Sequence, residues 1–373
     1  MGRRNIDVSG HALLCDEHGP FAPSRPSTAA AAAGGDVKQT MNQTPLYPLR
    51  FEPIYQYRLW GGRRLSDLLS APLPDGPIGE AWLLSDREDH RSLVAEGPLK
   101  GKTIEQLLKQ SPGQLLGKQA GHFTRFPLLL KFLDVSKSLS VQVHPPDWHM
   151  ELIPAGETGK TEAWVVLEAD AASRIYAGLT PGTAADNLRG AIASGRVEDH
   201  LASFTPKAGD GVLVRAGTVH SLSGVVVFEV QENSDVTFRL YDWEHIDPAT
   251  GRRRPLQVDQ ALACVDFSKV AIRPVVPMGV ETTPVTRERL FHCDQFGVWR
   301  ITGEAPFPVG KEGTPRVLVC LSGKGHLEYY GADYGFGKGD VVLLPAVVGV
   351  CRCRPDGAVC LLQISLPKGS IIP

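Results

Sequence analysis

The sequence predicts a mainly β protein, built as a sandwich, barrel or jelly roll. Gly (39) and Pro (29) are abundant among the 373 residues and separate many short apolar runs, a pattern typical of short strands joined by turns. The segments 209–216 and 339–346, about 130 residues apart, both read as a Gly-Asp turn followed by an apolar strand. This near-repeat indicates two related β modules.

The composition excludes several classes of protein. The formal net charge is −2 with 21% charged residues, which argues against a basic nucleic-acid binder. No apolar run reaches the roughly 18 residues that a membrane helix needs, so we expect no membrane partner. The seven cysteines are odd in number and scattered, which does not indicate a disulfide framework and predicts a reducing compartment, the cytoplasm.

The elements are expected in the following order. Residues 1–44 show no strand or helix period and predict a disordered extension. Helical spacing of leucines appears over 63–70 and 102–118, and a third helix is expected over 183–203, capped by Thr183 and packed through Leu188, Ile192 and Leu201. Apolar or alternating runs predict strands over 127–135, 138–144, 162–167, 211–214, 224–231 and 236–241, and after a polar connection over 245–258 only short strands over 290–367.

One predicted strand carries a polar face. Side chains alternate along a strand, so Ser140, Gln142 and His144 share one face of the run Leu139–Pro145. The strand could be half-buried with this face in water. It could equally be a barrel wall whose polar face turns inward, where Gln142 and His144 would both reach one metal ion.

Two further residues complete a possible ligand set. Glu162 opens the next predicted strand and His220 closes the run Ala216–His220. Two imidazoles and two side-chain oxygens suit zinc, and iron or manganese are also possible. Because a lone histidine is more often a core or surface residue than a ligand, spacing alone leaves the metal site open.

Two basic residues stand in β-like runs. Arg239 would share a strand face with Thr237 and Tyr241, and Glu229 lies on the preceding strand. An arginine inside a barrel is costly unless it is paired, so Arg239 either bridges to Asp235 or Glu229, or faces an anionic substrate or developing charge. Lys131 is the only basic residue inside its apolar run, and a buried lysine is rare unless paired or functional.

Seven blocks, taken in order, resemble the type I mannose-6-phosphate isomerases in their short bacterial form. The blocks are Leu49–Arg63, Gly79–Trp82, Phe126–Asp134, Leu139–Pro145, Gly159–Trp164, Gly217–His220 and Ser234–Trp243. The ordered match runs from about residue 46 to 266 and is looser to the end. Arg215, where many members have Pro, and Ala163, where Met or Tyr is common nearby, depart from the pattern.

The resemblance implies the fold and its division. It implies two cupin (jelly-roll) β-barrel domains, with a few helices inserted in or packed on the first. The catalytic, metal-binding domain would span 45–266, and a second, metal-free cupin-like domain 267–373, which has no His-X-His pair between Cys320 and Glu328.

The resemblance also implies the roles of the site residues. One Zn²⁺ per chain would be bound by Gln142, His144, Glu162 and His220. Arg239 would be the catalytic arginine, with Lys160 and Glu229 also in the catalytic set. Lys131, Ser140 and Trp60 would contact a sugar-phosphate substrate.

The implied reaction interconverts mannose 6-phosphate and fructose 6-phosphate through an enediol(ate). Glu229, His144 or a zinc-bound water could carry the proton, and spacing does not choose among them. Two other functions stay open, a metal-dependent cupin oxygenase and a non-catalytic sugar-phosphate-binding cupin. The sequence leaves the protein as a monomer or a small homo-oligomer.

Overall fold

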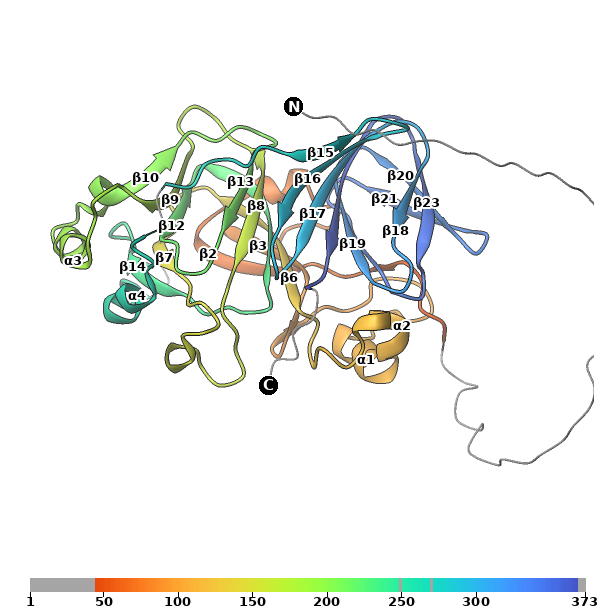
Figure 1. Ribbon diagram of the computed structural model, residues 1–373, viewed down its shortest axis with the longest axis horizontal. Coiled ribbons are helices and arrows are strands. Elements are labelled where there is room, and N and C mark those ends of the chain that lie inside the picture. The colour runs from red at the N-terminus through yellow and green to blue at the C-terminus, as the bar shows by residue number, and fades with distance from the viewer. Residues whose placement is uncertain (1–43, 248–249, 269–270, 368–373) are drawn as a thin grey trace, which may run out of the picture. The chain divides into compact units, whose positions relative to one another are not determined.

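Two antiparallel sheets contain most of the strands between residues 54 and 241 in the computed structural model (Figure 1), which describes residues 44–247, 250–268 and 271–367. The first is six-stranded, in the order β11 (Gly211–Val214), β8 (Glu162–Glu168), β13 (Val225–Glu232), β6 (Leu128–Val135), β2 (Ile54–Gly62) and β3 (Ile78–Leu84), with β6 also paired to β3. The second is five-stranded, in the order β10 (Leu201–Phe204), β9 (Arg174–Leu179), β12 (His220–Ser223), β7 (Val141–Val143) and β14 (Phe238–Tyr241).

Two more antiparallel sheets hold the C-terminal strands. The seven-stranded sheet runs β1 (Leu49–Arg50), β22 (Val341–Leu344), β19 (Arg316–Ser322), β24 (Val359–Ser365), β17 (Gly297–Gly303), β16 (Thr286–His292) and β15 (Met278–Glu281). The four-stranded sheet runs β18 (Phe307–Gly310), β23 (Val350–Pro355), β20 (Lys324–Tyr329) and β21 (Ala332–Gly337), and β4 (Asp86–Arg87) pairs separately with β5 (His90–Arg91). The mainly β prediction is therefore confirmed.

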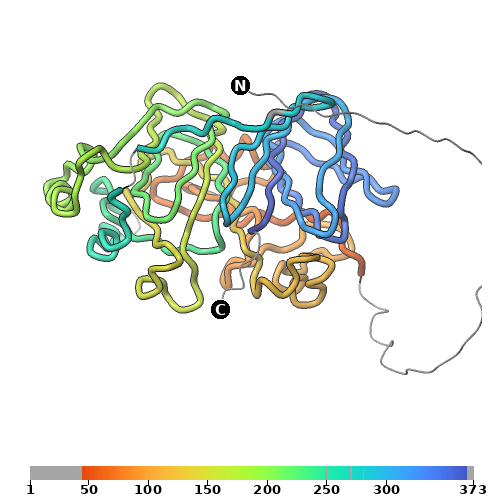
Figure 2. The backbone as a smooth tube through the Cα atoms, viewed as in Figure 1, coloured from red at the N-terminus to blue at the C-terminus, as the bar shows by residue number. Residues whose placement is uncertain are grey.

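The first strand, β1, pairs with a strand from the C-terminal part of the chain. In β1, Leu49 pairs with Leu343 and Arg50 with Val342 of β22, and the backbone trace shows this N-terminal segment running beside the C-terminal strands (Figure 2). The chain from Thr44 onward forms one compact unit. The domain division at residue 266 stays a prediction.

The Gly-Asp repeat is present in three dimensions. Asp210 Oδ2 accepts a hydrogen bond from the Lys207 amide, and Asp340 Oδ2 accepts one from the Gly337 amide, each at 2.8 Å. Gly209 and Gly339 have φ of 91° and 88°, a backbone region that favours glycine. The following strands β11 and β22 pair with β8 and β19 in the same way. The two modules therefore share one turn-and-strand construction.

The helices are shorter than the sequence pattern predicts. Over 102–118 the pattern resolves into α1 (Ile104–Gln110), capped by Thr103, and α2 (Pro112–Leu116). The break falls where Pro112 lacks the amide hydrogen that a continuous helix needs. Over 63–70 only a 3₁₀ turn forms, Arg64–Asp67. The fourth helix, α4 (Val258–Cys264), follows the polar connection.

The expected helix over 183–203 is wrong in its start and its end. Helix α3 spans Ala185–Ala193, and its N-cap is Ala184, not Thr183, whose hydroxyl instead contacts Thr180 and His200. The helix ends before Gly195, whose φ is 68°. Leu188 and Ile192 are buried as predicted, whereas Leu201 is buried in β10.

Several other expectations can be placed. The predicted extension 1–44 lies outside the described residues, except Thr44. Within the described residues, no helix is long and apolar enough to cross a membrane. The six cysteines in the described part of the chain are free. Cys351 and Cys353 are buried on one face of β23, as expected for residues two apart in a strand.

Candidate active site

Three predicted site residues lie in one row across the five-stranded sheet. Register pairs Arg239 of β14 with Gln142 of β7, and Gln142 with His220 of β12. Residues directly opposite in an antiparallel pair project to the same face. The polar face of the β7 strand therefore points into the protein, as the barrel-wall interpretation predicts: Gln142 is 8% exposed and His144 1%.

The six-stranded sheet presents a second row. Register aligns Trp164 of β8, Glu229 of β13, Lys131 of β6 and Trp82 of β3 on neighbouring strands. Glu162 precedes Trp164 by two residues and so shares its face. Contacts between Glu162 and the two histidines show that the two rows face each other across the same interior.

The structure brings His144, Glu162 and His220 together. Glu162 Oε2 lies 3.4 Å from His144 Nε2, and Glu162 Oε1 lies 3.3 Å from His220 Nε2. One ligand atom from each of the three residues falls within 4.8 Å of the other two. All three side chains are at most 1% exposed.

Both histidines are oriented by their other ring nitrogen. The Nδ1 atom of His144 lies 2.8 Å from the Val236 carbonyl oxygen, and that of His220 lies 2.9 Å from the Thr218 carbonyl oxygen. A carbonyl can only accept, so each Nδ1 carries the hydrogen and each Nε2 keeps its lone pair. Such a backbone contact is the usual support of a metal-binding imidazole, so the residues present fit a divalent metal.

Gln142 stands at the edge of this cluster with its amide reversed. Its Nε2 lies 3.2 Å from His220 Nε2, while its Oε1 accepts a hydrogen bond from Ser140 Oγ at 3.1 Å. The amide nitrogen cannot bind a cation, so Gln142 would serve as a ligand only after a half-turn of the amide group. Ser140 is thereby placed beside the cluster through Gln142.

Lys160 completes the electrostatics of the cluster. Its Nζ lies 2.7 Å from Glu162 Oε2 and 3.2 Å from His144 Nε2. Burial lowers the pKa of Lys160, but Glu162 and Glu229 outweigh it and raise the pKa above its usual value. For Glu162, burial raises the pKa, and Lys160 with the two histidines brings it well below the usual range.

The histidines are neutral for a related reason. Burial, followed by the Lys160 ammonium, lowers the pKa of His144 to about 3, and burial also lowers the pKa of His220. A neutral imidazole is the form that binds metal. The site therefore presents two neutral nitrogens, one carboxylate and one ammonium.

Lys131 belongs to a neighbouring charge network. Its Nζ lies 3.3 Å from Glu229 Oε2, 3.8 Å from Glu80 Oε2 and 5.1 Å from the centre of the Trp82 ring. On the other side of Glu229, Trp164 Nε1 donates to Oε1 at 2.9 Å, and the Trp164 ring packs 5.5 Å from that of His220. The network thus continues to the cluster of His144, Glu162 and His220.

Sequence reasoning gave no role to Glu80, Trp82 or Trp164. The first two lie in the block Gly79–Trp82 and the third in Gly159–Trp164, both of which carried the family resemblance. Their i and i+2 spacing puts Glu80 and Trp82 on one strand face. The pairing of β3 with β6 that brings this face to Lys131 is a tertiary feature and has no local signal.

Arg239 is not held by a carboxylate. Among the described residues it forms no ion pair with Asp235 or Glu229, so the bridging interpretation is wrong; its Nη1 donates to the Pro255 carbonyl oxygen at 3.0 Å. Its Nε is buried without a hydrogen-bond partner. Burial and the nearby Arg254 lower the pKa of Arg239. A guanidinium left with spare donors is suited to meet an anion.

Trp60 is placed differently from the other predicted site residues. It is 1% exposed and belongs to an apolar cluster that also includes Leu133 and Trp164. Its indole is thus linked to the site through packing, and substrate contact by Trp60 stays a prediction.

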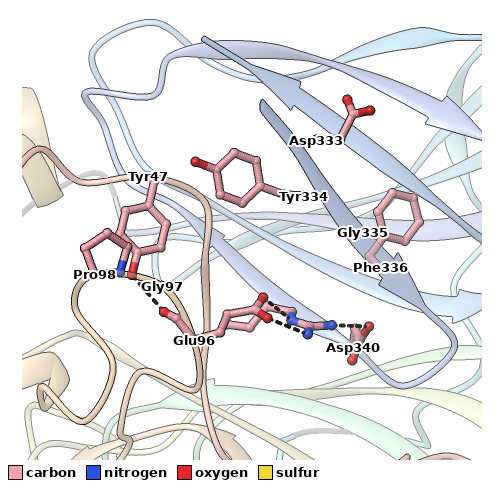
Figure 3. A pocket seen from close by; sticks show the side chains of 10 residues that line it. Tyr47, Glu96, Gly97, Pro98, Asp333, Tyr334, Gly335, Phe336 and Asp340 are labelled. Carbon is pink, nitrogen blue, oxygen red and sulfur yellow. Dashed lines mark hydrogen bonds and ion pairs between the residues drawn. The ribbon is translucent and has the colours of Figure 1, made fainter. Parts of the chain in front are cut away.

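A separate cavity of about 510 Å³ lies between the segment around β1 and strand β21 (Figure 3). It is lined by Tyr47, Arg50, Glu96, Gly97, Pro98, Asp333, Tyr334, Gly335, Phe336 and Asp340. Arg50 is paired with Glu96 at 2.8 Å and with Asp340 at 2.9 Å. The only cation of this lining is therefore already neutralised, and none of the predicted site residues lines the cavity.

Comparison with known proteins decides the family. The family model of the phosphomannose isomerase type I catalytic domain matches residues 49–165. The mannose-6-phosphate isomerase ManA of Bacillus subtilis is 33% identical over 306 residues, which are 81% of this chain and 94% of that protein. A mannose-6-phosphate isomerase of Streptococcus mutans is 32% identical, with 81% and 93% covered. The chain belongs to the type I phosphomannose isomerase family.

A solved structure of this family supports the fold. The crystal structure of the mannose 6-phosphate isomerase from Bacillus subtilis superimposes with a TM-score of 0.78 at 30% identity, covering 85% of this chain and 99% of that one. The fold class expected from the resemblance to type I phosphomannose isomerases is confirmed at the level of a mainly β protein of this family.

Proposed function

We propose that the protein interconverts mannose 6-phosphate and fructose 6-phosphate with one zinc ion per chain. The observation that carries the proposal is the buried cluster of His144, Glu162 and His220, in which both Nε2 atoms lie within 3.4 Å of one carboxylate. The choice of substrate rests on the similarity of the chain to mannose-6-phosphate isomerases.

The chain's own residues would hold the ion. His144 and His220 would bind through Nε2, Glu162 through its carboxylate, and Gln142 through Oε1 once its amide has turned. When bound, zinc supplies a Lewis acid that polarises a sugar oxygen. This donor set of two nitrogens and two oxygens is compatible with zinc.

Glu229 is the proposed proton carrier. Burial and Glu162 raise the pKa of Glu229, against the opposing effect of Lys131 and Lys160, so its carboxylate is a stronger base than an ordinary glutamate and is suited to take up a proton. In the aldose-to-ketose direction it would accept the proton from C2, while the C–H electron pair forms the C1–C2 double bond of the enediol(ate) and the C1 carbonyl pair moves onto O1. A proton would then pass from O2 to O1, and Glu229 would return its proton to C1 as the C2 carbonyl forms. His144 is a poorer carrier because its pKa is about 3.

The remaining residues would bind and orient. Lys160 stays protonated and donates to an oxygen of the substrate or to Glu162. Arg239, with spare donors beside Gln142, would stabilise negative charge that builds on the substrate oxygen as the C–H bond breaks. Lys131 and Ser140 would contact substrate oxygens.

The deciding experiment measures isomerisation of mannose 6-phosphate by metal-analysed protein in a coupled assay. We expect about one zinc per chain, loss of turnover with a chelator and recovery on adding Zn²⁺. Stoichiometric zinc without turnover, accompanied by a thermal shift on adding mannose 6-phosphate, would instead support the non-catalytic sugar-phosphate-binding function.

One observation favours a second candidate function. Two histidines and one carboxylate also form the facial ligand set of non-haem Fe(II) oxygenases. Iron in the purified protein together with oxygen consumption would support the oxygenase. Zinc with oxygen-independent isomerisation would exclude it.

A further inference from the structure

Glu80 is a buried carboxylate to which the proposed reaction assigns no role. Its side chain is 10% exposed, and Trp82 Nε1 donates to its Oε2 at 2.6 Å. Arg58 also binds the Glu80 carboxylate through two hydrogen bonds, with Nε 3.0 Å from Oε1 and Nη2 3.3 Å from Oε2. Bidentate pairing of this kind fixes the plane and the position of a carboxylate.

Lys131 depends on its neighbours for its position. Its side chain is 4% exposed, and the carboxylates recorded beside its Nζ are Glu80 and Glu229, at 3.8 and 3.3 Å. These separations are ion pairs rather than short hydrogen bonds, so N–H groups of Lys131 remain available to a substrate oxygen. The ammonium is thus held by charge from two sides.

The four groups form an alternating line of charge. Arg58, Glu80, Lys131 and Glu229 are positive, negative, positive and negative, and neighbours in this order are separated by 3.0, 3.8 and 3.3 Å. Arg58 is 29% exposed at the outer end, whereas Glu229 at the inner end is 5% exposed. Glu80 links Arg58 to Lys131 because its carboxylate contacts both cations.

We propose that Glu80, clamped by Arg58, is a positioning residue that fixes the Lys131 ammonium against Glu229 in the reaction cavity. Glu80 touches no reacting atom in this scheme and acts only through Lys131. The proposal rests on the proposed function for its effect on turnover. The contacts that carry it belong to β2, β3, β6 and β13 and do not include His144, Glu162 or His220.

The first test compares Glu80→Gln with Glu80→Asp in the full-length, zinc-loaded protein. Glu80→Gln keeps the shape and removes the charge, so we expect kcat to fall by up to about 100-fold with zinc content unchanged. Glu80→Asp keeps the charge and should recover a large part of kcat. Equal activity of wild type and Glu80→Gln would overturn the proposal.

A double-mutant cycle tests whether Arg58 acts through Glu80. Arg58→Gln alone should lower kcat less than Glu80→Gln, and in the Glu80→Gln background it should have no further effect. Additive losses would show that Arg58 acts independently. Arg300→Gln is the matched control, since it removes a similar pair with Glu288 at 2.7 Å in the C-terminal sheets and should leave kcat unchanged.

A readout without turnover separates this proposal from the proposed function. The Lys131 amine is held between two carboxylates, so removing the Glu80 charge should loosen it and speed its labelling by acetic anhydride relative to exposed Lys109 in the same sample, at least several-fold. If wild type does not isomerise mannose 6-phosphate but labelling accelerates in Glu80→Gln, the proposed function fails and the positioning survives. Unchanged labelling with unchanged kcat ends the positioning proposal.

Discussion

Arg239 lies directly opposite Gln142 in the β14–β7 pair, so both side chains project from the same face of the five-stranded sheet. This register places a guanidinium, for which no ion pair is found within the described part of the chain, beside the cluster of His144, Glu162 and His220. The His220 pairing with Gln142 continues the row. An anionic group bound at the cluster would therefore meet Arg239.

Replacement of Arg239 by alanine should lower turnover without removing metal. Loss of one donor that stabilises developing charge costs about 100- to 1000-fold in kcat. The measurement is steady-state isomerisation together with metal analysis. Arg189→Ala, which removes an exposed pair with Asp259, should leave both values unchanged. Loss of metal in Arg239→Ala would make the residue structural.

Replacement of Glu162 by glutamine should abolish metal binding and weaken the fold. The Lys160 ammonium, 5% exposed, would lose the carboxylate 2.7 Å away, and breaking a buried pair in this way costs about 3 to 5 kcal/mol. Urea unfolding and metal analysis report the two effects. Glu151→Gln is the control, because it removes a carboxylate that pairs with His149 and is 69% exposed. A variant that retained stoichiometric metal would contradict the ligand assignment.

The charge on Glu80 should make stability fall in acid. Burial raises its pKa, but Lys131, Arg58 and Trp82 outweigh it and lower the pKa from 4.5 to about 2. The native state thus holds fewer protons than the unfolded chain between these values, so this stabilisation of about 3 kcal/mol is present above pH 4.5 and is lost as the pH falls to 2.

The free energy of unfolding measured by urea at several pH values tests this dependence. Glu80→Gln should decline less steeply than wild type over this interval. Replacement of exposed Glu52 by glutamine should keep the wild-type slope. Identical slopes for wild type and Glu80→Gln would refute the assignment of the acid dependence to Glu80.

Alanine at Gly339 should destabilise the protein far more than alanine at Gly101. Both glycines have positive φ, 88° and 79°, so both variants lose about 1 kcal/mol from backbone strain. Only at Gly339 would the new Cβ lie 2.0 Å from the Leu68 carbonyl oxygen, whereas Gly101 has nothing within 4 Å. We expect a total loss above about 3 kcal/mol for Gly339→Ala, measured by urea unfolding; equal losses would exclude the clash.

The sequence by itself determined the β class, the Gly-Asp repeat, the polar face of the β7 strand and the family. These features are local, because strand alternation, turn residues and motif order are written in consecutive positions. Helix ends were predicted less well: Thr183 does not cap α3, and Pro112 divides the second helical segment.

Only the tertiary structure decided which of the candidate residues meet. Glu162 and His220 lie in strands of two different sheets, His144 directly follows β7, and Glu80 reaches Lys131 through the pairing of β3 with β6. The choice between a paired and an unpaired Arg239 likewise depended on where β14 lies. Contacts between residues far apart in the chain follow from sheet register and from the packing of one sheet on another, which no local pattern encodes.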